Sequence, residues 1–259
     1  MNDFLAAGEL AQTSYQPSLV AVSYAISVLG AFAALTAAQR IRGPRGLNLL
    51  NLLLAGVALG GIGVWSMHFT GMLALNLGMG SGYALVETLV SLVAAIGATS
   101  AALGFVALNP ASTARVVGAG VLLGLGVVFM HYLGMYGMRF PGYIVWTWST
   151  VALSVLLAIA ASTAALWLAF RSRSLPVRGV AAAVMGAAVC SMHYTGMAAA
   201  DFICTTGPAD RFAIPKGPLV ISAMDLPVLT VMVAAGMAAV IGFDQLLLSM
   251  QQGRMRAKA

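Results

Sequence analysis

From Leu47 to Leu77 the sequence reads LNLLNLLLAGVALGGIGVWSMHFTGMLALNL, without a single Asp, Glu, Lys or Arg. A helix rises about 1.5 Å per residue, so roughly 20 apolar residues cross the hydrocarbon core of a bilayer. This stretch is therefore predicted to form a transmembrane helix, and its extra length allows a juxtamembrane turn or a tilt. It also contains His68, one of the three histidines in the chain.

The whole chain has the composition of an integral membrane protein. Of its 259 residues, 61% are hydrophobic and 8% are charged, whereas soluble domains carry about 25% charged residues. We therefore predict an all-α membrane protein whose main solvent is the lipid bilayer. Stretches long enough to span occur at about residues 17–39, 47–77, 83–108, 115–138, 145–170, 177–200 and 226–250, which predicts seven transmembrane helices.

The charged residues predict the orientation of these helices. The net charge is +6, but the cations lie in short loops between apolar stretches rather than on one face, so no direct nucleic-acid contact is expected. Cytoplasmic loops are enriched in Lys and Arg, which places the N-terminus outside and the C-terminus in the cytoplasm. The cations of the predicted inner side are Arg40, Arg42, Arg45, Arg115, Arg171, Arg173, Arg178, Arg254, Arg256 and Lys258. Those of the outer side are Arg139, Arg211 and Lys216.

The three histidines, His68, His131 and His193, stand in one repeated frame, 63 and 62 residues apart. This period equals one helical hairpin, so we predict a single domain over residues 1–259 with two-helix repeats at about 17–77, 83–138 and 145–200. The seventh helix, at about 226–250, is an addition. Repeats of the same orientation are related by an axis along the membrane normal, which predicts a pseudo-three-fold arrangement. The frames are Met67-His68-Phe69-Thr70-Gly71-Met72, Met130-His131-Tyr132-Leu133-Gly134-Met135 and Met192-His193-Tyr194-Thr195-Gly196-Met197.

These frames contain residue types that bind metals, near the outer ends of their helices. Imidazole binds copper, zinc and iron, and the thioether of Met favours Cu(I); three histidines alone also suit an open zinc site. Each His shares a helix face with the Met four residues later, whereas the Met before it is rotated by about 100°. One shared site and three separate sites both remain open, and so does a packing role for the histidines. The candidate ligands are His68, His131, His193, Met72, Met135, Met197, Met67, Met130 and Met192.

The triple frame at hairpin spacing resembles the MHYT family of bacterial membrane sensor domains, over nearly the whole chain. The resemblance implies a multi-pass protein of the inner membrane, with a cytoplasmic output domain for cyclic-di-GMP synthesis or degradation, a kinase or a DNA-binding module. It further implies that copper held by the nine Met and His residues senses a diatomic gas (O2, CO or NO). Phe69 and Leu133 depart from the family's Tyr and Thr; neither removes a ligand, but no role of those hydroxyls can hold in all three repeats.

The leading hypothesis is therefore a non-enzymatic signal-input module that responds to a gas or to redox state. Its output domain would be fused in a longer protein or supplied by a separate partner, because nine residues follow the seventh predicted helix; a homodimer is compatible with this function. The alternative is a copper or small-solute transporter, and haem bound by two histidines is a third. Cys190 and Cys204 are not expected to form a disulfide, and the acidic N-terminus predicts no cleavable signal peptide.

Overall fold

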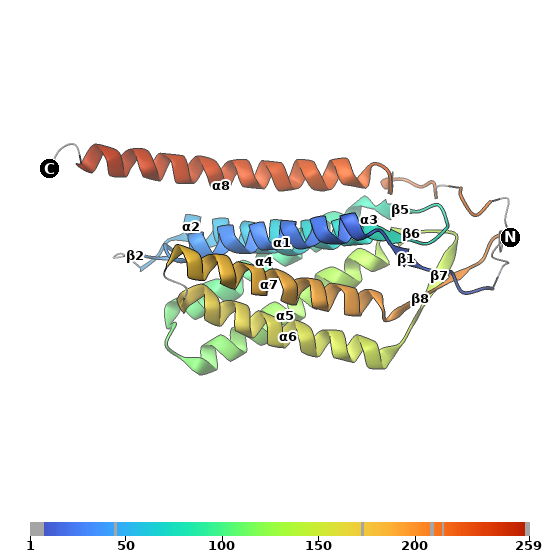
Figure 1. Ribbon diagram of the computed structural model, residues 1–259, viewed down its shortest axis with the longest axis horizontal. Helices are drawn as coiled ribbons and strands as arrows, with labels where there is room; N and C mark the ends of the chain where they lie inside the picture. The colour runs from blue at the N-terminus through green and yellow to red at the C-terminus, as the bar shows by residue number, and fades with distance from the viewer. Residues whose placement is uncertain (1–7, 44–45, 172–173, 208–209, 214, 257–259) are drawn as a thin grey trace.

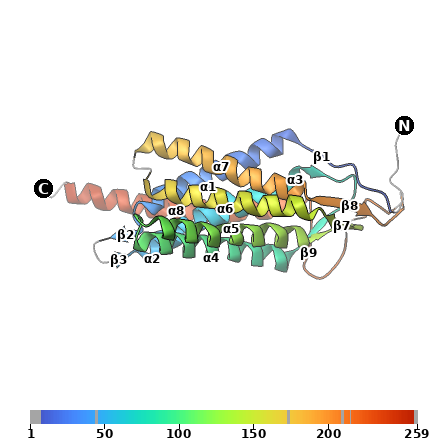
Figure 2. The same ribbon diagram turned by 90° about the horizontal axis from the view of Figure 1, so that it is seen from below.

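The computed structural model describes residues 8–43, 46–171, 174–207, 210–213 and 215–256, with the backbone alone at 240–241, 244–249 and 251–256. The helices are α1 (Pro17–Ala38), α2 (Leu49–Gly56), η1 (Val57–Ser66), α3 (Met67–Ala74), α4 (Leu85–Leu108), α5 (Thr113–Tyr136), α6 (Trp148–Arg171), α7 (Leu175–Met197) and α8 (Leu226–Arg256). Here α2, η1 and α3 form one continuous helix, and η1 is a π-helix. All of these helices run along the long axis of the molecule (Figures 1 and 2).

Six of these helices within the described residues are long and apolar enough to cross a membrane, counting α2–η1–α3 as one. Their ends lie within a few residues of the predicted boundaries. The chain is therefore mostly helical, with the long apolar helices expected of an all-α membrane protein. The described apolar part of α8, Leu226–Ala239, is shorter than these, so the seventh span stays a prediction.

Local sequence explains where several helices begin. Pro17 opens α1, where its missing N–H costs nothing. The side chains of Asn48 and Ser112 accept hydrogen bonds from the backbone N–H of Asn51 and Arg115, which caps α2 and α5. Short connections then return the chain through the bundle as antiparallel neighbours.

The bundle packs through small residues, and α8 lies along its outside. In sequence order α4 packs on α5, α5 on α6, and α6 on α7, while α1 packs between α7 and η1. At Gly124 a Cβ would lie 2.7 Å from the Cα of Ile159, so α5 and α6 approach each other backbone to backbone. Helix α8 packs on η1 and α3, along one flank of the bundle (Figure 1).

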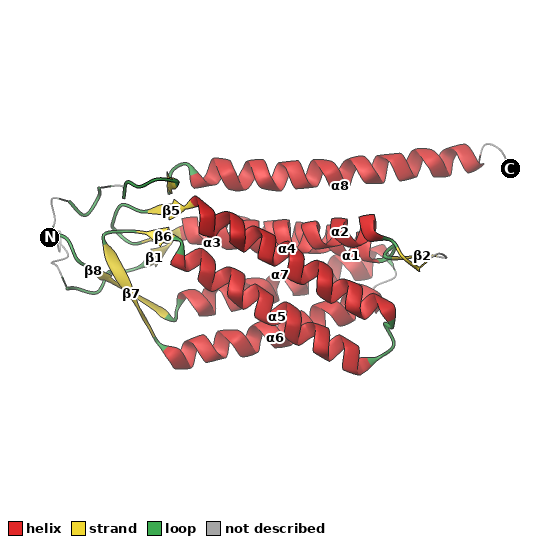
Figure 3. Ribbon diagram, turned by 180° about the vertical axis from the view of Figure 1, so that it is seen from behind, coloured by secondary structure: helices red, strands yellow, loops and turns green. Residues whose placement is uncertain are grey.

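Short strands gather at the end of the bundle where α3, α5 and α7 finish (Figure 3). They form a β1–β4 pair, a β6–β5–β9 sheet and a β7–β8 pair in which Trp146 faces Ala200 and Gly142 faces Cys204. A separate β2–β3 pair lies at the opposite end. The strands are β1 (Ser14–Tyr15), β2 (Arg42–Gly43), β3 (Gly46–Leu47), β4 (Leu75–Asn76), β5 (Gly82–Ala84), β6 (Met138–Arg139), β7 (Gly142–Trp146), β8 (Ala200–Cys204) and β9 (Val220–Ser222).

The apolar surface of the bundle is exposed on its flanks, as lipid contact requires. Leu29, Val93 and Leu156 belong to three different helices and are 67%, 70% and 65% exposed. A soluble protein rarely exposes so continuous an apolar surface. The buried interior instead follows the central axis, and it includes all three histidines.

Candidate metal centre

Helices α3, α5 and α7 bring the three histidines together near the strand-covered end of the bundle. His68 and His131 are 0% exposed and His193 is 1% exposed. The three Nδ1 atoms face one another: His68 and His193 are 3.0 Å apart, His131 and His68 3.1 Å, and His193 and His131 3.3 Å. The rings meet edge to face, with centroids 4.9, 4.9 and 5.2 Å apart. The three histidines therefore form one cluster, which decides between the shared site and the three separate sites that the sequence left open.

Hydrogen bonds alone cannot satisfy this triangle. A neutral imidazole carries its proton on one nitrogen only. If one Nδ1 carries a proton it can donate to its neighbours, but the other two lone pairs then face each other. If two carry protons, two N–H groups compete for one acceptor and face each other instead. A single cation at the centre is the arrangement that satisfies three converging lone pairs.

The size of the triangle suits such a cation. The point equidistant from the three Nδ1 atoms lies about 1.8 Å from each, which is the triangle's side divided by √3. A zinc–imidazole bond measures about 2.0–2.1 Å, so each ring would move outward by only ~0.2–0.3 Å to hold zinc. These three histidines are also a group whose ligand atoms all lie within 4.8 Å of one another. They could therefore hold one metal ion in a trigonal arrangement.

The glycine of each frame makes room for the histidine of another frame. A Cβ on Gly71 would overlap Nε2 of His193, one on Gly134 would overlap Nε2 of His68, and one on Gly196 would overlap Nε2 of His131. The histidine of α7 thus lies against the glycine of α3, the histidine of α3 against the glycine of α5, and the histidine of α5 against the glycine of α7.

This role of the frame glycines was not predicted from the sequence. The three Nε2 atoms are buried without a hydrogen-bond partner among the described residues. In each of the three rings, Nδ1 faces the other two histidines and Nε2 faces a glycine of a neighbouring helix.

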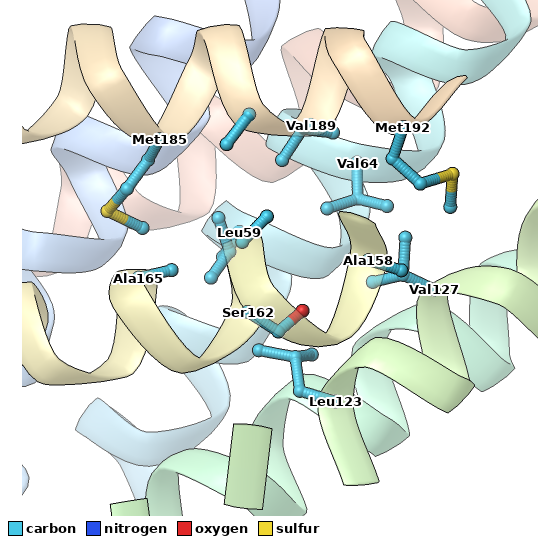
Figure 4. Close-up of a pocket in the computed structure, with 12 residues that line it drawn as sticks. Leu59, Val64, Leu123, Val127, Ala158, Ser162, Ala165, Met185, Val189 and Met192 are labelled. Carbon is cyan, nitrogen blue, oxygen red and sulfur yellow. The ribbon is translucent and has the colours of Figure 1, made fainter. Parts of the chain in front are cut away.

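All six methionines of the frames are buried, with exposed fractions of 2% or less. Met72, Met135 and Met197 lie one helical turn beyond the histidines, toward the strand-covered end, on the same helix faces. Met192 instead lines a cavity (Figure 4). Of the nine predicted residues, the three histidines thus converge, and the role of the six buried thioethers as ligands stays a prediction.

The tyrosines of the frames bind serines on neighbouring helices. The hydroxyl of Tyr194 is 2.9 Å from Oγ of Ser23 in α1, and that of Tyr132 is 2.8 Å from Oγ of Ser154 in α6. Both serines are fully buried. These bonds fix the rotation of α5 and α7 and hence the direction of their histidines.

In the first frame Phe69 has no hydroxyl, and a tryptophan takes over the bond. Trp65 stands one turn earlier and packs against Phe69, with ring centroids 4.8 Å apart. Its Nε1 donates to the carbonyl of Thr88 and to Oγ of Ser91 in α4, each at 3.0 Å. The departure from Tyr at Phe69 therefore coincides with Trp65, which has no counterpart in the other two frames.

The short strands cover the frame residues at this end of the bundle. Tyr15 stacks edge to face on Tyr194, with centroids 5.7 Å apart. Its burial, with a smaller effect of Tyr194, raises the pKa of Tyr15 to about 12, so its hydroxyl stays protonated at neutral pH. Cys190 and Cys204 are both free thiols in this structure.

Comparison with known proteins adds a family to this geometry. A family model described as MHYT, bacterial signalling protein N-terminal repeat, matches residues 61–120 and 124–182. The chain is 42% identical over 195 residues to the Pseudomonas aeruginosa protein named bifunctional diguanylate cyclase/cyclic di-GMP phosphodiesterase MucR. It is 36% identical over 192 residues to an uncharacterized signaling protein of Caulobacter vibrioides, and 32% identical over 196 residues to the P. aeruginosa cyclic di-GMP phosphodiesterase NbdA.

These matches cover most of this chain but a minor part of each relative. They include 73%, 74% and 73% of this chain and only 28%, 24% and 25% of the three relatives. No solved structure matches the chain.

Proposed function

This chain belongs to the MHYT family of bacterial signalling proteins, and we propose that it is a membrane sensor module whose three histidines hold a metal ion. The observation that carries this proposal is the triangle of Nδ1 atoms, which no set of hydrogen bonds satisfies. We propose copper as the metal, with zinc as the alternative, because six buried thioethers flank the triangle and soft ligands favour Cu(I). A bound metal would offer an open position at which a diatomic gas or a redox change is sensed.

We propose further that the six spans form three repeats about a pseudo-three-fold axis. The cyclic contact between each histidine and another frame's glycine supports this. So does the cyclic pairing of each frame with a buried serine on another helix: Ser154 for the second frame, Ser23 for the third, and Ser91 through Trp65 for the first. In this arrangement the domain comprises residues 1–259, with α8 outside the repeats.

The signal would leave through α8. This helix packs on η1 and α3, the segments that lead to and contain His68. A Cβ on Gly61 of η1 would overlap Sδ of Met237, so the two helices meet without a gap. A ligand shifts such an equilibrium only if it binds one arrangement more tightly than the other. The output would be a cytoplasmic domain, fused or separate, of the cyclic-di-GMP type that the names of MucR and NbdA describe.

Transport is the alternative function, and the interior argues against it. On the other side of the histidines the axis is lined by apolar side chains, among them Leu59, Leu123 and Met185. A charged ion in such surroundings loses its solvation without gaining ligands. Labelled copper that accumulated in liposomes containing the protein would nevertheless favour transport over sensing.

The first test is the metal content of the purified protein. After depletion and reloading, the wild type should bind near-stoichiometric copper or zinc, and a variant with His68, His131 and His193 replaced by Ala should bind none. Mass spectrometry measures the metal, and helical circular dichroism shows that both proteins are folded. An equally folded wild type that binds no metal would refute the proposal.

Two methionine variants then separate copper from zinc. Replacing Met72, Met135 and Met197 with Leu removes the thioethers on the histidine faces and keeps the volume. We expect this variant to lose Cu(I) affinity while it keeps zinc. The matched control replaces Met67, Met130 and Met192 with Leu. An equal loss of Cu(I) affinity in the two variants would contradict a preferred role for the methionines on the histidine faces.

A further inference from the structure

A small apolar cavity lies at the centre of the bundle, one helical turn below the histidines and away from the strands. Val64, Val127 and Val189 line it, and each precedes the histidine of its own helix by four residues. Because residues four apart share a helix face, these valines form a layer beneath the Nδ1 triangle. Figure 4 shows them around the cavity, with Met192 beside them.

The cavity has room for one small molecule but offers water no partners. It gives about 20 Å³ to the centre of a water-sized sphere, and roughly 10–15 Å³ is enough for one molecule of that size. A buried water needs about two to four polar partners. Ser162 carries the only hydroxyl among the twelve lining residues, and the others are Leu, Val, Ala and Met. The cavity therefore suits an uncharged molecule that needs no hydrogen bonds.

One wall of the cavity reaches toward the flank of the bundle. Ala161 of α6 and Ala188 and Val189 of α7 are only half-buried, whereas Leu59, Leu123 and the rest of the wall are buried. This flank faces hydrocarbon if the six helices span a membrane. Small apolar molecules leave water for hydrocarbon, so the lipid would both concentrate such a molecule and deliver it between α6 and α7.

We propose that this cavity binds one small apolar molecule of the diatomic-gas class, taken up from the hydrocarbon core rather than from the outer aqueous side. The role of this cavity rests on the proposed sensing function. Its occupant would lie below the histidine triangle, on the side away from the strands. The occupant also contacts Val64 of η1, the helix that packs on α8. Binding in the cavity would thus occur directly beneath the valines that support the histidine helices and at the start of the path to α8.

Dissolved O2 is the probe that tests the cavity, because its paramagnetism accelerates the relaxation of nearby methyl groups. The whole chain, with labelled Leu and Val methyl groups in lipid nanodiscs, is compared under oxygen and under nitrogen. The methyl groups of Leu59, Val64, Leu123 and Val127 should relax much faster under oxygen. Equally buried Leu35, Leu103 and Leu166, which do not line the cavity, should change little, and equal effects in both sets would overturn the proposal.

Three variants of α5 sharpen this result. Val127→Phe fills the cavity and should abolish the enhancement at Leu59 and Val64, whereas Val121→Phe on the exposed flank of the same helix should leave it unchanged. Val127→Ala enlarges the cavity and should increase the enhancement, which keeps the test decisive if Val127→Phe does not fold. An enhancement that is the same in all three variants would refute the site.

The same measurement on metal-depleted protein separates this proposal from the metal site. Oxygen uptake by the depleted protein, together with a failure to bind metal after reloading, would keep the cavity and refute the metal centre. Stoichiometric metal without any enhancement at the cavity methyl groups would keep the metal centre and refute the cavity.

Discussion

A single glycine in each frame decides whether a histidine can reach the centre. Gly134 faces Nε2 of His68, and a Cβ there would overlap the ring. We expect Gly134→Ala to displace His68, because the buried ring has no free space to occupy. Overpacking of this kind costs about 1–3 kcal/mol, and the displaced Nδ1 should also lower the affinity for metal. Thermal unfolding in detergent and metal content after reloading measure the two effects.

Gly179→Ala is the matched control for this substitution. Gly179 lies in α7, and a Cβ there meets no atom within 4 Å. Because Ala favours a helix over Gly by up to about 1 kcal/mol, Gly179→Ala should leave the metal bound and the protein at least as stable. If Gly134→Ala behaved in the same way, the glycine would have no part in placing the histidine.

At the scale of residues, the sequence predicts three histidines at equal depth, but neither their convergence nor their orientation. The repeated frame leaves one shared site and three separate sites open for His68, His131 and His193. It does not reveal that Nδ1 faces inward, because this depends on which neighbouring helix supplies the glycine. Trp65 is likewise missed as a partner of Ser91, since the bond joins two different helices, η1 and α4. The sequence offers one indication of this bond: Trp65 lies four residues before Phe69, in the only frame that lacks the tyrosine.

At the scale of elements, the unusual feature is the π-helix η1. Leu59, Leu123 and Met185 line the same cavity on three helices, 64 and 62 residues apart, whereas the histidines are 63 and 62 apart. The segment from Leu59 to His68 thus contains one residue more than the segments that lead to His131 and His193, and η1 spans most of it. Oγ of Ser66 donates to the carbonyl of Gly61, five residues earlier. Periodicity alone predicts a longer span with a turn or tilt, and does not show how a helix absorbs one extra residue. Such π-helical turns frequently lie at functional sites.

The contact between η1 and α8 can be tested at Gly61. Replacing Gly61 with Leu fills the space that Met237 occupies, so we expect α8 to move away from the bundle while the metal stays bound. Spin labels are placed at Val231 and Leu156, which are both exposed, in a background with Cys190 and Cys204 replaced by Ala. Double electron–electron resonance then reports the movement of α8 as a longer distance between the two labels. Gly97→Leu is the control, since a Cβ there meets nothing within 4 Å. An unchanged distance in Gly61→Leu would argue against a close η1–α8 contact.

At the scale of the whole molecule, the charges at the two ends of the bundle differ. The end with the β2–β3 pair carries the described cations Arg40, Arg42, Arg115, Arg171 and Arg178. Two of these lie over aromatic rings at the rim of the bundle, Arg115 over Phe105 and Arg171 over Trp167. Of the cations that predict the orientation, Arg45, Arg173 and Lys258 lie outside the described residues.

At the strand-covered end the positive charge is weaker. Arg139 forms an ion pair with Glu87 at 2.7 Å, and Asp201, Asp210 and Asp225 lie at the same end. Because cytoplasmic loops are enriched in Lys and Arg, the strand-covered end should face outward. The histidines would then lie in the outer half of the membrane, and α8 would run inward toward a cytoplasmic output domain.

Labelling of single cysteines decides this orientation. In a variant with Cys190 and Cys204 replaced by Ala, one cysteine is placed at Gly207 in the strand-covered end or at Ala111 between α4 and α5; both positions are exposed. A membrane-impermeant maleimide added to intact cells that express the protein should label Gly207→Cys at once and Ala111→Cys only after the membrane is opened. The reverse pattern would put the histidines near the cytoplasm and the end of α8 outside, where no cytoplasmic output domain could receive its movement. The labelling therefore tests the orientation on which the proposed relay through α8 depends, independently of whether a metal or a gas is bound.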